Sequence, residues 1–116
     1  ELDGPEGFRR LIDMSLELHN LSPDFHREMS ALKYTDSDVR KMTDKQDEEV
    51  IRFVVAHLKS QGTSVRVRDL EAAAYVIHDA MEAVVHNIKI FGSPIEADRL
   101  KNALADMLCR YLFDVE

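Results

Sequence analysis

DLEAAAYVIHDAMEAVVHNIKIF, residues 69–91, carries the clearest helical pattern of the chain. Its apolar residues recur three or four positions apart, which lines them up along an α-helix. Asp69 stands where an N-cap residue is expected, and Gly92 follows the last apolar residue. We therefore expect one long, very apolar helix between them. Its two apolar lines are Leu70, Ala73, Ile77, Met81, Val84, Ile88 and Phe91, and Ala72, Val76, Ala80, Ala83 and Ile90.

A second apolar helix is predicted directly after the first. Ser93 is placed as an N-cap residue, Pro94 as the first helical residue, and Glu96 completes a capping box with Ser93. This helix should continue to about Phe113. Its apolar positions are Leu100, Leu104, Met107, Leu108 and Tyr111, with Ala105, Cys109, Leu112 and Phe113 beside them.

These two helices carry more apolar surface than a small domain can cover by itself. An exposed apolar patch of that size usually marks an interface. Two antiparallel helices packed against their own copy form a four-helix bundle with two-fold symmetry. We therefore predict a homodimer. The predicted interface consists of Val76, Ala80, Ala83, Val84, Leu100, Leu104, Met107, Leu108 and Tyr111.

The remainder of the chain also has helical patterns, and turn residues separate them. One helix follows Pro5, a short one begins near Ser22 and Pro23, and a long one ends at Gly62. Residues 63–68, TSVRVR, alternate in polarity, but a single short strand has no partner here, so we expect an extended loop. The predicted fold is all-α, with about five helices in one domain over residues 1–116.

Composition excludes several classes of function. The net charge of -7 argues against direct binding to nucleic acid. A single cysteine, Cys109, rules out an internal disulfide and fits a buried thiol in a reducing compartment. With no secretory signal and no long apolar run, we expect a soluble cytoplasmic protein that does not associate with membranes. The chain opens with Glu1, which suggests a piece of a longer protein.

The sequence has no phosphate loop, nucleophile elbow or HExxH motif, so we expect neither an enzyme nor a cofactor.

His78, Glu82 and His86 lie four residues apart and should share one helix face. Imidazole and carboxylate groups in this arrangement can bind zinc or a similar cation. The same three residues can also be the polar edge of a helix that is apolar elsewhere. We favour the polar edge and keep the metal site as the alternative.

A ligand cavity is expected between the first four helices. Methionines on several apolar faces suit an adaptable pocket, although they are also ordinary core residues. His57 lies among apolar residues and is more simply explained as a core or pocket-lining histidine than as a ligand contact. The predicted lining is Leu11, Met14, Leu18, Phe25, Met29, Phe53, His57, Tyr75 and His78.

Residues 62–113 resemble the C-terminal half of TetR-type transcriptional regulators. That pattern has a glycine, an extended connector, an aspartate opening an Ala-rich helix, and a capped last helix ending in a run such as YLF. The positions that match it are Gly62, Asp69, Ala73, Glu82, His86 and Leu112. Residues 16–29, LELHNLSPDFHREM, resemble the family's middle helices.

The resemblance implies an effector-binding and dimerisation domain of a transcriptional repressor. Family members carry an N-terminal helix-turn-helix domain, and nothing in residues 1–116 resembles it. DNA would then be bound only through that separate domain, and a small-molecule effector bound here would control it. Two alternatives stay open, namely a dimeric helical adaptor that senses nothing and a metal-binding helical bundle.

Overall fold

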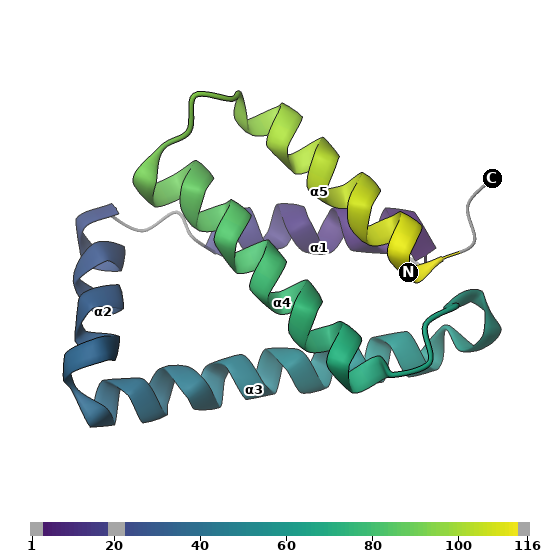
Figure 1. Cartoon of the computed structure of the whole chain (residues 1–116), viewed down its shortest axis with the longest axis horizontal. Coiled ribbons are helices and arrows are strands. Elements are labelled where there is room, and N and C mark those ends of the chain that lie inside the picture. The colour runs from purple at the N-terminus through teal and green to yellow at the C-terminus, as the bar shows by residue number, and fades with distance from the viewer. Residues whose placement is uncertain (1–3, 19–22, 114–116) are drawn as a thin grey trace.

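The structure, a computed structural model, describes residues 4–18 and 23–113. Five α-helices account for most of these residues, as predicted (Figure 1). No β-strand forms among them apart from one isolated backbone bridge. The elements are α1 (Gly4–Leu18), α2 (Pro23–Thr35), α3 (Ser37–Ser60), the 3₁₀ turn η1 (Gly62–Ser64), α4 (Leu70–His86), the π-helical turn η2 (Asn87–Phe91) and α5 (Ala97–Leu112).

Aspartate side chains begin the two helices that matter most for the site. Asp36 caps α3, and its Oδ1 accepts hydrogen bonds from the backbone N–H groups of Asp38 and Val39 at 2.9 and 3.2 Å. Asp69 caps α4 by accepting from the N–H of Ala72 at 3.1 Å. Both satisfy donors that a helix start leaves without partners. The sequence prediction of Asp69 as a cap is confirmed.

The turn between α4 and α5 differs from the prediction. Gly92 adopts φ 80°, which ends η2, but α5 begins only at Ala97, after Glu96. Ser93 Oγ accepts a hydrogen bond from the N–H of Ile95 at 3.1 Å, two residues further on. Serine makes such local turns as readily as helix caps. The predictions of Ser93 as N-cap and Pro94 as first helical residue are therefore wrong.

The connector after α3 was predicted to be extended over residues 63–68. Its first two residues lie in the 3₁₀ turn η1, whereas Val65 is extended and has a partner. Val65 forms an antiparallel backbone bridge with Phe113, and the N–H of Arg66 donates to the carbonyl of Leu112 at 2.8 Å. The guanidinium Nε of Arg66 also donates to the carbonyl of Tyr111 at 3.1 Å. These bonds join the start of the connector to the end of α5. Sequence spacing could not reveal this pairing, because the partner lies more than forty residues away.

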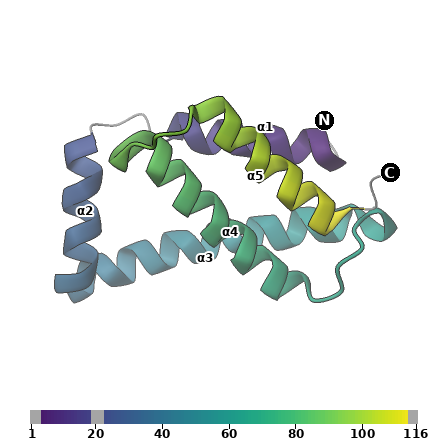
Figure 2. The same ribbon diagram turned by 45° about the horizontal axis from the view of Figure 1, so that its top comes forward.

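The helices form two layers with α2 at one end. In Figure 2, α4 and α5 lie side by side in front of α3 and α1, and α2 stands across the N-terminal end of α3. Arg27 of α2 donates to the carbonyl of Ile90 at 2.8 Å, which attaches α2 to the end of the α4 segment. The core fills the space between the layers. It includes Phe8, Ile12, Ile51, Val54, Leu58, Ala74, Ile77, Leu104, Ala105, Leu108, Cys109, Leu112 and Phe113.

Candidate functional site

An apolar cavity of about 190 Å³ lies between α1, α3 and α4. Leu11 and Met14 come to it from α1, Phe53 from α3 and His78 from α4. The structure therefore brings together four of the side chains predicted to line a pocket. The complete lining is Phe8, Leu11, Met14, Ser15, Val50, Phe53, Val54, Ile77, His78, Met81 and Glu82.

A larger and more polar cavity of about 520 Å³ lies between α2, α3 and α4. Phe25 and Met29 line it from α2, as does His78 from α4. Its size is in the range of small-molecule sites. The complete lining is Phe25, His26, Met29, Ser30, Lys33, Thr43, Gln46, Asp47, His78, Asp79, Glu82, Ala83 and His86.

His78 and Glu82 line both cavities. They lie one turn apart on α4, so the apolar and polar cavities meet along this stretch of the helix. We call the two cavities together the cleft. It offers an apolar compartment beside α1 and a polar compartment beside α2.

Three predicted pocket residues are not shown lining the cleft. Tyr75 lines two other cavities between α3 and α4. His57 packs edge-on against Phe8, with ring centroids 6.4 Å apart. The side chain of Leu18 lies outside the described part of the chain. The prediction for His57 and Tyr75 followed their apolar neighbours in sequence, which do not fix the side of the helix on which a cavity opens.

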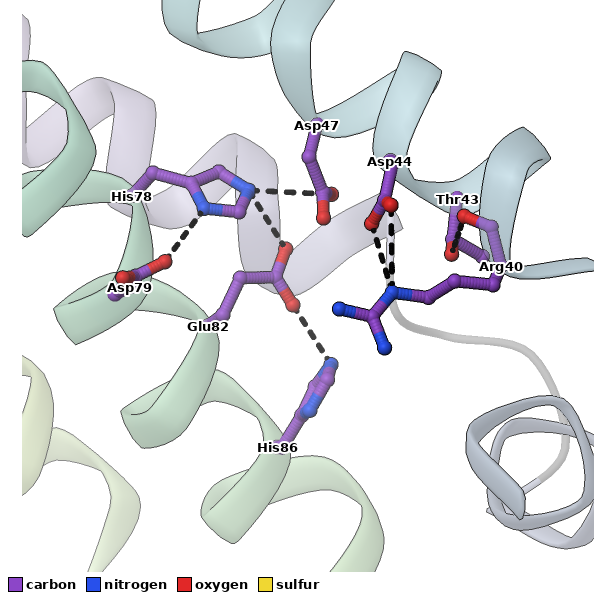
Figure 3. A network of polar contacts seen from close by, with 8 residues as sticks. All are labelled: Arg40, Thr43, Asp44, Asp47, His78, Asp79, Glu82 and His86. Carbon is purple, nitrogen blue, oxygen red and sulfur yellow. Dashed lines mark hydrogen bonds and ion pairs between the residues drawn. The ribbon is translucent and has the colours of Figure 1, made fainter. Parts of the chain in front are cut away.

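A cluster of histidine and carboxylate groups occupies the polar side of α4 where it faces α3 (Figure 3). We call Asp47, His78, Asp79, Glu82 and His86 the histidine–carboxylate cluster. His78 is the most buried of these groups, with 8% of its side chain exposed, and its Nδ1 lies 3.2 Å from Asp79 Oδ1. His78 Nε2 lies 3.4 Å from Asp47 Oδ1 and 3.8 Å from Glu82 Oε1. The other oxygen of Glu82, Oε2, lies 2.8 Å from His86 Nε2.

The predicted triad is therefore adjacent in space as well as in sequence, but it does not form a metal cage. His78 and His86 approach different oxygens of Glu82. Within residues 4–18 and 23–113, no group of three His, Cys, Asp or Glu side chains is arranged to hold a metal ion. The geometry supports the interpretation of the triad as a polar edge, with the addition that this edge lines a cavity.

Sequence reasoning missed Asp47 and Met81 as parts of the cleft. Asp47 lies in the polar first half of α3, where it is one of many charged residues and looks like part of a solvated face. Met81 lies on an apolar line of the predicted helix, which indicates only that this side of the helix is apolar. Neither residue carries a local signal, because its role depends on how α3 crosses α4.

The outward side of α4 and α5 presents part of the predicted dimer interface. Val76 is 59% exposed and Met107 is 55% exposed. Ala83 and Tyr111 are also exposed, whereas Ala80, Val84 and Leu100 are half-buried. Ala83 lines the polar cavity of the cleft. We call Ala72, Val76, Ala103, Met107 and Tyr111 the outer face.

Leu104 and Leu108 do not belong to that face. They are 4% and 2% exposed and pack into the protomer's own core. The sequence placed them in the interface because they share an apolar line with Met107, but the inward side of α5 follows Leu104, Leu108 and Leu112. The prediction that Leu104 and Leu108 lie in the dimer interface is therefore wrong.

Residues 5–112 match the family model described as Tetracyclin repressor-like, C-terminal domain. The chain belongs to this family. The match covers nearly the whole chain and agrees with the resemblance seen in its sequence. No curated protein and no solved structure matches the chain.

The family assigns the chain to a class of regulatory domains of transcription factors. In the described ranges, residues 4–18 and 23–113, no helix has the length and hydropathy needed to span a bilayer.

Proposed function

We propose that this chain is the effector-sensing and dimerisation domain of a TetR-type transcriptional repressor, which controls a separate helix-turn-helix domain. One observation carries the proposal. Helix α4 lines the cleft with Ile77, His78, Met81 and Glu82, and presents Val76 on the outer face. A ligand in the cleft would therefore touch the same helix that contacts a partner.

The packing supports coupling between the cleft and the outer face. Helix α1 contributes Leu11 and Met14 to the cleft and is also attached to α5, where Lys101 Nζ lies 3.0 Å from Asp13 Oδ1. A ligand that separates α1 from α4 would move both helices of the outer face. Such a ligand shifts the equilibrium between two arrangements by the difference in its affinity for them.

Dimerisation explains the composition of the outer face. Small residues such as Ala72 and Ala103 allow two helices to approach closely, and Val76 and Met107 supply apolar area. Packed around a two-fold axis, two copies of α4 and α5 form a four-helix bundle. Such burial removes from water the most exposed apolar side chains of both helices.

Sedimentation equilibrium tests the dimer. We expect a mass of twice the 13.3 kDa of the chain. Val76→Arg places two charges per bundle in an apolar contact region or prevents assembly, so it should sediment as a monomer. Leu32→Arg, at an exposed apolar position of α2, is the matched control and should remain dimeric. A monomeric wild-type chain would refute the dimer.

A thermal-shift screen with small molecules tests effector sensing. A molecule that binds the folded chain raises its melting temperature. We expect hits whose effect is lost in Phe53→Ala, because Phe53 lines the cleft. A dimer whose hits are all insensitive to cleft substitutions would favour the helical adaptor over the sensor.

A further inference from the structure

The position of the ring proton on His78 decides which kind of group its other ring nitrogen can bind in the cleft. An ionised carboxylate only accepts hydrogen bonds, so the contact between His78 Nδ1 and Asp79 at 3.2 Å places a proton on Nδ1. In the neutral ring, Nε2 then carries a lone pair. This lone pair is directed at the region of Asp47 Oδ1 and Glu82 Oε1, which are acceptors as well. Three acceptors therefore converge where a donor is required.

His78 Nε2 has no hydrogen-bond partner among the described residues. Asp47 Oδ1, at 3.4 Å, lies beyond the usual length of an N–H···O bond, and Glu82 Oε1 lies further away. The His78 side chain is more than nine-tenths buried, so solvent has little access to it. A buried polar nitrogen without a partner costs free energy, which a donor in the cleft would recover.

The charge around this point is negative. Asp47, Asp79 and Glu82 contribute three carboxylates. The nearest arginines on α3 pair with other acids: Arg40 Nε lies 3.1 Å from Asp44 Oδ1, and Arg52 Nη2 lies 3.3 Å from Glu48 Oε2 (Figure 3 shows the first pair). Lys33 and His26 line the polar cavity from α2. A cationic donor fits this environment better than a neutral or anionic one.

The apolar compartment begins at the same two residues. His78 and Glu82 also line the cavity formed by Phe53, Met81 and Met14. A molecule with its charged group at His78 would therefore extend its apolar body between α1 and α3. Methionine side chains adapt to varied apolar shapes.

We propose that the effector is an amphipathic amine, whose ammonium group donates to His78 Nε2, Asp47 and Glu82 and whose apolar body occupies the cavity around Phe53. This proposal rests on the effector-sensing function proposed above. A primary ammonium group has three N–H donors and no acceptor, which matches three converging acceptors. Charge-assisted bonds to carboxylates are also stronger than neutral ones.

The fit requires only a small adjustment of side chains. Three acceptors around one ammonium nitrogen stand roughly 4.5 Å apart when each N···acceptor distance is about 2.8 Å. Asp47 and Glu82 are 38% and 35% exposed, so both can rotate away from His78 to reach this spacing. A metal ion fits less well, because no three ligands in the described ranges have a metal-binding arrangement.

Isothermal titration calorimetry of the 116-residue chain tests the proposal with three probes that share one apolar tail: n-octylamine, 1-octanol and octanoate. We expect octylamine to bind about tenfold or more tightly than octanol, and octanoate to bind most weakly. Asp47→Asn and Glu82→Gln should each lower the affinity for octylamine about tenfold while leaving the affinity for octanol unchanged. Glu49→Gln replaces an exposed acid of α3, the helix that carries Asp47. It is the matched control and should change neither affinity.

Several results would overturn the inference. Equal affinities for octylamine and octanol would show that the cleft binds apolar molecules without selecting a cation, and the sensing function would survive. Preference for octanoate, or absence of binding by all three probes, would exclude an amphipathic amine, while the dimer would be judged separately by its mass. Loss of octylamine binding on adding zinc, together with a zinc-dependent rise in melting temperature that requires His78, would assign the cluster to a metal. Circular dichroism of each variant shows whether it is folded.

Discussion

The cleft and the outer face expose apolar side chains to nearly the same degree, yet they differ in shape and in polar neighbours. Phe53 in the cleft is 60% exposed and Val76 on the outer face is 59% exposed. Phe53 borders a cavity that continues to the histidine–carboxylate cluster. Val76 lies on the outer face, with Ala72 one helical turn before it. Concavity and converging polar groups, rather than exposure, are therefore the reasons for proposing a ligand site in the cleft and a protein interface on the outer face.

The largest expected effect comes from breaking both surfaces at once. Ile77 is fully buried in α4 and packs in the core between the two layers. Ile77→Ala should lower the free energy of unfolding by about 2–5 kcal/mol, because it removes buried methyl groups and leaves a cavity. Urea denaturation measures the change. Tyr34→Ala, at an exposed position of α2, is the control and should change the free energy of unfolding by less than about 0.5 kcal/mol.

A pair of substitutions separates the two surfaces. Phe53→Ala should lower the affinity for 1-octanol about tenfold and leave the dimer intact, because the lost apolar area belongs only to the cleft. Met107→Arg should weaken the dimer and leave octanol binding unchanged. For both variants, calorimetry measures the affinity for octanol and sedimentation equilibrium measures the mass. If either variant loses both properties, the division into two surfaces is wrong.

The sequence predicted more of the fold than of the cleft, for a physical reason. Helix starts depend on local chemistry, so the cap at Asp69 could be predicted from a few residues. An apolar line such as Leu104, Met107 and Leu108 shows that a helix has apolar sides, but not which side faces the protomer's own core. Asp47 became part of the cleft only because α3 crosses α4 at that point. Contacts between helices decide such positions, and periodicity within one helix carries no information about them.

The cap of α4 tests whether the outer face depends on the helix start more than the cleft does. Asp69 accepts from the N–H of Ala72, which lies on the outer face, whereas His78 lies about two and a half turns after Asp69. Asp69→Ala should lower the free energy of unfolding by about 1 kcal/mol and loosen the first turn, with a larger effect on dimer mass than on octanol binding. Asp69→Asn keeps a capping oxygen and should stay within a few tenths of a kcal/mol of wild type. A loss of octanol binding that exceeds the loss of dimer would reverse this order.

The smallest expected effect concerns Cys109, on the inward side of α5 opposite the outer face. Burial raises the pKa of its thiol above the ordinary value of 9.0, the charge of Arg9 lowers it, and Asp106 raises it further. Because the folded pKa lies above the unfolded one, the contribution of this group to stability is complete below about pH 9 and is lost as the pH rises through the folded pKa. Cys109→Ala should therefore lose less stability than wild type between pH 8 and pH 10, as measured by urea denaturation. Alkylation by iodoacetamide should also be slow in the native protein and fast in urea, since only the thiolate reacts and burial disfavours it.

Met107→Cys, combined with Cys109→Ala, places a thiol on the outer face instead. Its alkylation should be rapid in the monomer and slow in the dimer, which would compare the two sides of α5 directly.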